Sequence, residues 1–301
     1  MSAKERIRRL ALISIGVALV VVALKTWAWW ITGSVALYSD ALESTVNIIA
    51  ALVAWYAIRV SHMPADDEHP FGHHKAEYLS AVLEGVLIVI AALLIIREAL
   101  PALIDPPDLQ QADLGLAVSI LSTVINGIWA WILIRAGREA RSPALVADAR
   151  HIFSDVVTSI GVVVGLLLAL ATGWLFLDPL LALVVAANIL WQGWKLVNES
   201  IQGLMDRAAE PEDHDRIERI ILGNAGGAIE IHDLKTRVAA RATFIEFHMV
   251  VNANTTVAVS HAICDRIEAA LRAEIPSVRV TIHVEPDNEA KNDASASTLA
   301  V

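Results

Sequence analysis

Two short helical stretches carry side chains that could bind a metal ion. In the first, His151 and Asp155 lie four residues apart, so on a helix both project from one face. The apolar segment 156–170 follows them, and an ionisable pair at membrane depth is costly and indicates an ion pathway. Imidazole and carboxylate groups are common ligands of divalent transition metals. The pair therefore predicts a metal-binding face on this helix.

A second stretch repeats this spacing ahead of another apolar segment. Asp40, Glu43 and Asn47 recur at intervals of three and four residues, again on one helix face. If the two helices face each other, three oxygen-bearing side chains and one imidazole surround a single point, namely Glu43, Asn47, Asp155 and His151. The alternative is that each pair is a polar contact between packed helices. Two pairs at matching spacing favour the metal site.

The composition limits the class of protein. The chain has 301 residues, of which 56% are hydrophobic, and a mean hydropathy of +0.56, so most of it is expected to face a lipid bilayer. Its single cysteine, Cys264, excludes an intrachain disulfide and a cysteine-rich metal cluster. The net charge of -10 without clustered Lys and Arg argues against nucleic acid as a partner.

Six apolar segments have about the 20 residues that a membrane span needs. A signal peptide is the alternative for the first, but its apolar run is too long and Thr26–Trp30 is typical of an aromatic belt. Basic residues concentrate in residues 1–9 and in the loops after spans two and four, which predicts a multi-pass inner-membrane protein with both termini in the cytoplasm. The expected spans are 10–32, 35–58, 79–100, 113–136, 151–173 and 177–197, within a membrane domain of residues 10–200.

Residues 208–287 have the pattern of a small cytosolic domain. Helix-like and strand-like segments alternate there, and the second strand has Ile245, Phe247 and Met249 on one face. The order predicts an αββαβ, ferredoxin-like α+β domain with helices on one face of a three-stranded sheet. The small, polar tail 288–301 predicts disorder. The expected elements are helix 211–222, strand 228–237, strand 243–251, helix 256–273 and strand 278–284.

Two more groups of possible ligands lie outside the spans. In the loop 64–77, three consecutive acidic residues precede three histidines, a dense ligand set for which a solvated polar loop is the alternative. In the terminal domain, three histidines fall on the three expected strands and one on the helix between them. Isolated histidines on strands are usually structural, but four in one domain beside a carboxylate favour metal binding. They are His232, His248, His283 and His261, with Glu285 as the carboxylate.

The chain resembles the cation diffusion facilitator family of metal/proton antiporters, from about residue 8 to residue 287. The resemblance implies a homodimer whose transport site lies between spans two and five and is loaded from the cytosol. The motifs that carry it are Ser39-Asp40-Ala41, His69-Pro70-Phe71-Gly72-His73, His151-x-x-x-Asp155, Leu204-Met205-Asp206 and His232-Asp233-Leu234.

Position by position, the resemblance assigns three metal sites and one ion pair. The transport site falls on Glu43, Asn47, His151 and Asp155, with Asp40 beside them; the loop site on Asp66, His69 and His73; the cytosolic cluster on His232, His248, His261, His283 and Glu285; and an interlocking salt bridge near the dimer pivot on Lys75 and Asp206. The family usually has His or Asp, then Asp, where this chain has Glu43 and Asn47. These harder ligands favour iron(II) or manganese(II), whereas the order of affinities favours zinc.

The sequence therefore predicts a transporter, not an enzyme. It is expected to export zinc, iron(II) or manganese in exchange for protons, and metal binding to the cytosolic domain is expected to regulate it. An intramembrane metalloprotease is a poor alternative because no His-Glu-x-x-His motif is present. A metal receptor with a membrane anchor would have no use for polar groups at membrane depth. A sensor or assembly partner from the same family, with a decayed transport site, stays open because of Glu43 and Asn47.

Overall fold

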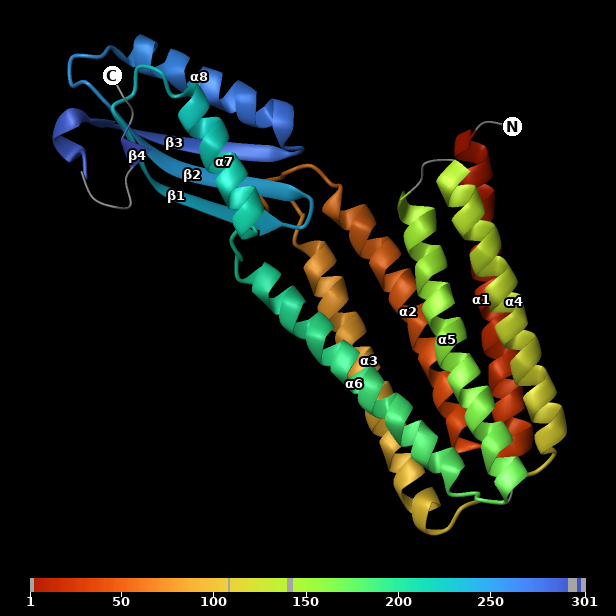
Figure 1. Ribbon diagram of the computed structural model, residues 1–301. Helices are drawn as coiled ribbons and strands as arrows, with labels where there is room; N and C mark the ends of the chain where they lie inside the picture. The colour runs from red at the N-terminus through yellow and green to blue at the C-terminus, as the bar shows by residue number, and fades with distance from the viewer. Residues whose placement is uncertain (1–2, 108, 140–142, 292–296, 299–301) are drawn as a thin grey trace. The chain divides into compact units, whose positions relative to one another are not determined.

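The computed structural model describes residues 3–107, 109–139, 143–291 and 297–298 (Figure 1). Within these ranges, only the backbone is described for 3–9, 11–12, 137–139, 143–148, 150–151 and 297–298. The chain forms two compact units, one of residues 1–55 and 82–197 and the other of residues 56–81 and 198–301. Each unit is treated separately below.

Six of the described helices are long and apolar enough to cross a membrane. Each has at least 20 residues in its apolar segment, and a helix rises about 1.5 Å per residue, so each can span a hydrocarbon layer of about 30 Å. The six expected spans are therefore confirmed. The helices are α1 (Ala3–Thr32), α2 (Val35–Ser61), α3 (Ala76–Ile104), α4 (Ala112–Glu139), α5 (Pro143–Thr172) and α6 (Leu177–Leu204).

Small residues let helices of the first unit approach closely. A Cβ atom added to Gly85 of α3 would lie 2.5 Å from Val197 Cγ2 of α6, and one added to Gly193 of α6 would lie 3.2 Å from the Gly85 carbonyl oxygen. Such reciprocal contact is typical of membrane helices, which associate by close packing rather than by expulsion of water. The outer surface exposes large apolar side chains, Trp30 and Trp191 among them, as a lipid-facing surface requires.

A buried carboxylate fixes the start of α2. Asp178, near the beginning of α6, accepts a hydrogen bond from the Val35 backbone N–H at 2.7 Å and another from the Ser34 hydroxyl. The first N–H groups of a helix have no partner within the helix, so a side-chain acceptor stabilises them. Asp178 therefore holds the beginnings of α2 and α6 together.

The second unit contains a four-stranded sheet in the order β3-β2-β1-β4. Strands β1 and β2 are antiparallel, β2 and β3 are parallel, and β4 adds a short antiparallel pairing at the edge of β1. Figure 1 shows α7 and α8 beside this sheet. The elements are α7 (Pro211–Asn224), β1 (Glu230–Ala239), β2 (Ala242–Val251), α8 (Val257–Glu274), β3 (Val278–Pro286), the 3-10 turn η1 (Asp287–Glu289) and β4 (Ser297–Thr298).

One face of the sheet packs against both helices. The core of this unit joins Ile221 of α7 and Ile267 of α8 to Ile245, Phe247 and Met249 of β2. The predicted alternation of β2 and the predicted αββαβ order are thus confirmed. Part of the tail for which composition predicted disorder has regular structure, because η1 continues β3 and β4 pairs with β1. The opposite face of the sheet is left uncovered by α7 and α8.

Candidate metal centres

The predicted transport-site residues of α2 and α5 face each other within the first unit. The Asn47 side-chain amide donates to both carboxylate oxygens of Asp155, at 3.4 and 3.3 Å. Glu43, one turn earlier on α2, is half-buried and interacts electrostatically with Asp155. Because the amide hydrogen-bonds to the carboxylate, both groups are already directed at one point between the helices. The side chain of His151 lies outside the described residues.

A small cavity adjoins this pair. Its volume is about 90 Å³, and Ser44, Asn47, Asn126 and Asp155 contribute the polar part of its lining. These side chains come from α2, α4 and α5, while α1 supplies apolar residues. A water molecule occupies about 30 Å³ in the liquid, so the cavity has room for a divalent ion with a few waters. Asn126 is a polar neighbour of the site that sequence reasoning missed.

A buried lysine binds α1 to both site-bearing helices. The Lys25 ammonium donates to Asp40 Oδ1 at 2.8 Å, to the Ser44 hydroxyl at 2.8 Å and to the Ser159 hydroxyl at 2.9 Å. Ser159 also donates to Asp40 Oδ1, at 2.7 Å. Lys25 and Asp40 each have side chains only 2% exposed. Hydrogen bonds stabilise a buried pair of this kind, and here α1, α2 and α5 supply them to the ammonium and to Asp40 Oδ1, whereas the buried Asp40 Oδ2 has no hydrogen-bond partner among the described residues.

This hydrogen-bond network separates Asp40 from the transport-site residues beside which the sequence placed it. Its carboxylate is engaged by Lys25 and Ser159, and Asp40 does not line the cavity beside Asn47 and Asp155. The structure therefore does not bring Asp40 into the pair, because its carboxylate is held by a protein cation. The signal that could have found this was in the sequence: Lys25 is the single charged residue of segment 13–32, and such a residue requires a partner.

The three predicted ligands of the loop site come together. The ligand atoms of Asp66, His69 and His73 lie within 4.8 Å of one another. The backbone N–H of His69 donates to Asp66 Oδ1 at 2.7 Å, and this bond is the main reason that the pKa of Asp66 is lowered. Gly72 adopts φ +89° between the two histidines, a conformation that glycine reaches without strain. The loop is thus folded so that a carboxylate and two imidazoles converge.

The predicted pair Lys75 and Asp206 also forms. Lys75 Nζ lies 3.0 Å from Asp206 Oδ1, and Arg237 Nη1 of β1 lies 3.1 Å from the same oxygen. The Arg237 guanidinium stacks over Phe244 at 4.1 Å and over Phe71 of the loop at 5.3 Å from the ring centres. The hydrogen bond from Lys75 is the largest of the effects that lower the pKa of Asp206. These contacts hold the loop site against the sheet within the second unit.

Replacing Lys75 by Ala is expected to loosen this loop. Without the ammonium, one ion pair and one hydrogen bond from Lys75 to the Leu204 carbonyl are lost, so hydrogen exchange of residues 62–75 should become faster. Mass spectrometry of exchange in the full-length protein measures this. Glu246→Gln, at an exposed position of β2, is the control. Equal exchange in Lys75→Ala and the native chain would contradict this role.

The same contact should depend on pH. Since the pKa of Asp206 is lowered in the folded state, its stabilising effect is present above the unfolded value of about 3.9. It is lost as the pH falls through the folded-state pKa. Asp206→Asn should therefore speed exchange of the loop at neutral pH, and the difference from the native chain should vanish in strong acid after correction for intrinsic rates.

The strand register places three histidines in one row. His232 of β1 pairs with His248 of β2, and His248 pairs with His283 of β3. Residues in register project from the same face of a sheet, and Glu285 projects there too because it lies two positions beyond His283. The ring centres of neighbouring histidines are 5.1 and 4.9 Å apart. Alternation and register together therefore build a cluster on the uncovered face.

Glu285 contacts all three histidines of the row. Its carboxylate oxygens lie 3.2 Å from His232 Nε2, 2.8 Å from His248 Nδ1 and 3.6 Å from His283 Nε2. Among the described residues, buried His248 Nδ1 and Glu285 Oε2 nevertheless have no partner with hydrogen-bond geometry. Buried polar atoms without directed partners are rare. Lone pairs that converge in this way fit a divalent metal ion held by imidazoles and a carboxylate.

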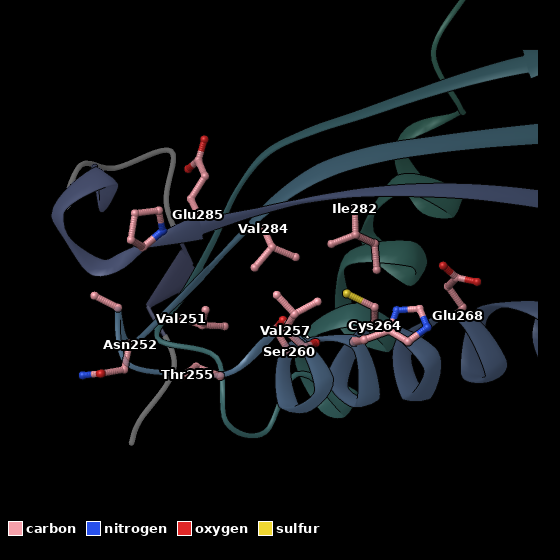
Figure 2. Close-up of a pocket in the computed structure, with 13 residues that line it drawn as sticks. Val251, Asn252, Thr255, Val257, Ser260, Cys264, Glu268, Ile282, Val284 and Glu285 are labelled. Carbon is pink, nitrogen blue, oxygen red and sulfur yellow. Dashed lines mark hydrogen bonds between the residues drawn. The ribbon is translucent and has the colours of Figure 1, made fainter.

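The structure does not bring His261 into this cluster. It lies on α8, where its nearest acidic neighbour is Asp265 at 3.7 Å. Figure 2 shows why: Ile282 and Val284 point from β3 towards α8, whereas the Glu285 side chain points the other way. His261 lines a pocket of about 430 Å³ next to α8. Glu285 lines the same pocket, but its carboxylate contacts the three histidines of the row, and His261 is paired with Asp265 instead.

A further acidic residue lies beside the row. Ligand atoms of His232, Asp233 and His248 lie within 4.8 Å of one another. Asp233 has φ +54° at an irregularity of β1, after which the register with β2 shifts, so it leaves the alternation of the strand. Its pKa is lowered mainly by a hydrogen bond from Lys291. Sequence reasoning assigned Asp233 only to a motif, since nothing in the strand pattern shows this irregularity.

Comparisons with known proteins agree with a membrane part and a terminal domain. Residues 11–205 match the cation efflux transmembrane domain, and residues 209–287 match the cytoplasmic domain of cation efflux proteins. The chain is 47% identical over 285 residues to the uncharacterized transporter sll1263 of Synechocystis sp., covering 95% of this chain and 92% of that protein.

Two bacterial pumps are also similar over nearly their whole length. The cation-efflux pump FieF of Klebsiella pneumoniae is 33% identical over 288 residues, covering 94% of this chain and 93% of the pump. FieF of Pectobacterium atrosepticum is 34% identical over 277 residues, covering 90% and 89%. With six helices that can span a membrane and a terminal α+β domain, the chain therefore belongs to the cation efflux family, the cation diffusion facilitators, whose members are transporters and not enzymes.

Proposed function

We propose that this chain exports a divalent transition-metal ion from the cytosol in exchange for protons. The metal passes between α2 and α5 in a multi-pass inner-membrane protein whose two termini are cytoplasmic. The single observation that carries the proposal is the convergence of Asn47 and Asp155 beside a cavity that other polar side chains also line, between helices that can span a membrane. Polar and ionisable groups are placed there at a cost that a purely structural span has no need to bear.

The proposed transport site consists of Glu43, Asn47, His151 and Asp155. As found, the Asn47 amide nitrogen faces Asp155; rotation of the amide would present its oxygen instead, and only that oxygen can bind a cation. Metal binding would therefore replace the two hydrogen bonds between Asn47 and Asp155 by oxygen ligands from both side chains. Lys25 binds Oδ1 of Asp40 and neutralises its charge, and Asp40 does not line the cavity, so the site acts with the carboxylates of Glu43 and Asp155.

Proton exchange follows from the chemistry of the ligands. Imidazole must be neutral and a carboxylate ionised to bind a metal, so metal and protons compete for the same groups. We assign the exchanged proton to His151 or to one of the two carboxylates. On the outer side, protonation would displace the metal, and an inward proton gradient would drive export through alternating access.

Zinc is the proposed cargo, with iron(II) and manganese as the alternatives. The general order of affinities favours zinc over iron(II) and manganese at a site with nitrogen and oxygen ligands. Two carboxylates and an amide make the membrane site harder than one built from imidazoles, which reduces that preference. Selectivity therefore depends on how closely α2 and α5 approach when the metal is bound.

The loop and the cytosolic cluster are proposed to load and regulate the transporter. Asp66, His69 and His73 form an exposed site that could capture metal. The cytosolic cluster, defined here as His232, His248, His283 and Glu285, would bind a second ion and report the metal concentration. We also propose that the protein works as a homodimer through its cytoplasmic domain.

Transport by proteoliposomes tests this function. Zinc, iron(II) under reducing conditions, manganese and cobalt are offered one at a time while a pH gradient is imposed. We expect uptake of zinc that grows with the gradient, and smaller uptake of at least one of the others. Absence of uptake for all four metals, in vesicles that contain folded protein, would contradict the proposal.

The second candidate is a metal sensor of the same family that does not transport. One observation favours it: the cytosolic cluster has three imidazoles and a carboxylate in mutual contact, whereas the membrane pair is held by a weak amide contact. Metal binding to the full-length protein without any flux would support this candidate.

A further inference from the structure

Glu230, the first residue of β1, is a carboxylate buried within the sheet. It is 0% exposed and lies two residues before His232, so both project from the uncovered face. A buried carboxylate is costly unless it is paired and hydrogen-bonded. Its oxygen Oε1 lies 2.9 Å from His232 Nδ1 and accepts a hydrogen bond from the Lys291 backbone N–H at 3.0 Å.

The contact with Glu230 determines which nitrogen of His232 can bind a metal. An ionised carboxylate only accepts hydrogen bonds, so Nδ1 of His232 must carry the hydrogen. In the neutral ring, which is the form that binds a metal, the remaining nitrogen Nε2 has a free lone pair, and it lies 3.2 Å from Glu285 Oε2. Nε2 and Glu285 thus offer two lone pairs to the same region. A cation completes this arrangement.

The carboxylates of Glu230 and Glu285 contact opposite nitrogens of the His232 ring. Glu230 pairs with Val250, and Val250 pairs with Glu285, so the two carboxylates occupy the row next to the histidines. His232 is contacted by Glu230 through Nδ1 and by Glu285 through Nε2. The ring is therefore fixed in orientation as well as in tautomer, which a metal ligand requires.

The segment after β3 holds Glu230 in place. The 3-10 turn η1 leads to Lys291, whose backbone N–H bonds Glu230 while its ammonium bonds Asp233 Oδ2 at 2.7 Å. These contacts close the chain over the buried carboxylate, so its position does not depend on β1 alone.

We propose that Glu230 is the positioning residue of the cytosolic cluster. It does not bind the metal; it holds His232 with Nε2 directed at the ion and makes that nitrogen more basic. This inference rests on the proposed metal binding by the cytosolic cluster and adds a residue to it. Removal of a carboxylate that supports a metal-bound histidine usually weakens metal affinity by about 10- to 100-fold.

Zinc affinity of the full-length protein tests the inference. Asp155→Ala and His69→Ala form the background, so that the transport and loop sites do not obscure the cluster, and a chromophoric chelator competes for zinc. We expect Glu230→Ala to weaken binding by up to about 100-fold and Glu230→Gln, which keeps the shape, by about 10-fold. Glu246→Gln, at an exposed position of β2 on the same face of the sheet as His248, should leave the affinity unchanged.

A spectroscopic signature separates positioning from a merely structural role. Nitrogen-15 spectra of histidine-labelled protein report which ring nitrogen carries hydrogen. We expect His232 to hold its hydrogen on Nδ1 in the native chain, and to lose this fixed tautomer in folded Glu230→Gln. Native tautomer and native affinity in Glu230→Gln would overturn the inference.

A further variant distinguishes an error about the role of Glu230 from an error about metal binding by the cytosolic cluster. His248→Ala, in the same background, should abolish tight zinc binding. If it does so while Glu230→Gln binds as tightly as the native chain, the cluster is correct and the inference about Glu230 is wrong. If His248→Ala binds zinc normally, the cluster is not the site and both are wrong.

Discussion

Replacing Asp155 by Ala is expected to reduce metal transport to the level of empty vesicles while leaving metal binding in the terminal domain intact. Asp155 of α5 accepts two hydrogen bonds from the Asn47 amide of α2. Without it, the site loses a carboxylate and the acceptor that orients the Asn47 amide. Cations at membrane depth require compensating charge, so the ion should no longer enter. Flux and equilibrium zinc binding, measured on the same preparation, check both parts.

A neighbouring position supplies the matched control. Ser154 precedes Asp155 on α5 and is exposed, so Ser154→Ala should transport as the native chain does. Asn47→Asp is informative in the opposite direction, because it adds a carboxylate and should tighten metal binding. Normal flux in Asp155→Ala would show that the metal takes another path.

Of the replacements described here, Lys25→Met is expected to lower the free energy of unfolding the most. The ammonium is the partner of Asp40, and both side chains are 2% exposed. Removing one member of a buried ion pair leaves an uncompensated charge and typically costs about 3–5 kcal/mol. The midpoint of thermal unfolding in detergent should fall by on the order of 10 °C.

The double replacement Lys25→Met with Asp40→Asn is the control for this stability effect. It removes both charges, so it should be markedly more stable than Lys25→Met alone. Ser44 and Ser159 remain available as hydrogen-bond partners for the new amide. If the single and double variants unfold at the same temperature, the ion pair is not what holds α1 to α2 and α5.

The sequence was sufficient for the architecture because two periodicities dominate it. Apolar runs of about 20 residues allow only membrane helices, and the six runs coincide with α1 to α6. In the terminal domain, alternation in β2 assigned Ile245, Phe247 and Met249 to the core face. The same alternation places His248 on the opposite face, where the row forms.

The side-chain contacts within the sites were harder to predict from the sequence than the fold. The pairing of Lys25 with Asp40 depends on which faces of α1 and α2 meet, which spacing along one helix does not determine. Glu230 had no motif, because its role follows from strand register and from the return of Lys291. His261 was assigned to the cluster because four histidines fall in one small domain, and by resemblance, yet it lies on α8, on the side of the sheet towards which Ile282 and Val284 point.

The central claim, proton-coupled export through α2 and α5, is tested most directly by recording proton movement during metal transport. Zinc is added outside proteoliposomes that contain a pH-sensitive dye, with the native chain or with Asp155→Ala. The account predicts that zinc entering the vesicles drives protons out, and that both movements disappear in Asp155→Ala. Zinc entry without proton movement, or unchanged exchange in Asp155→Ala, would contradict it.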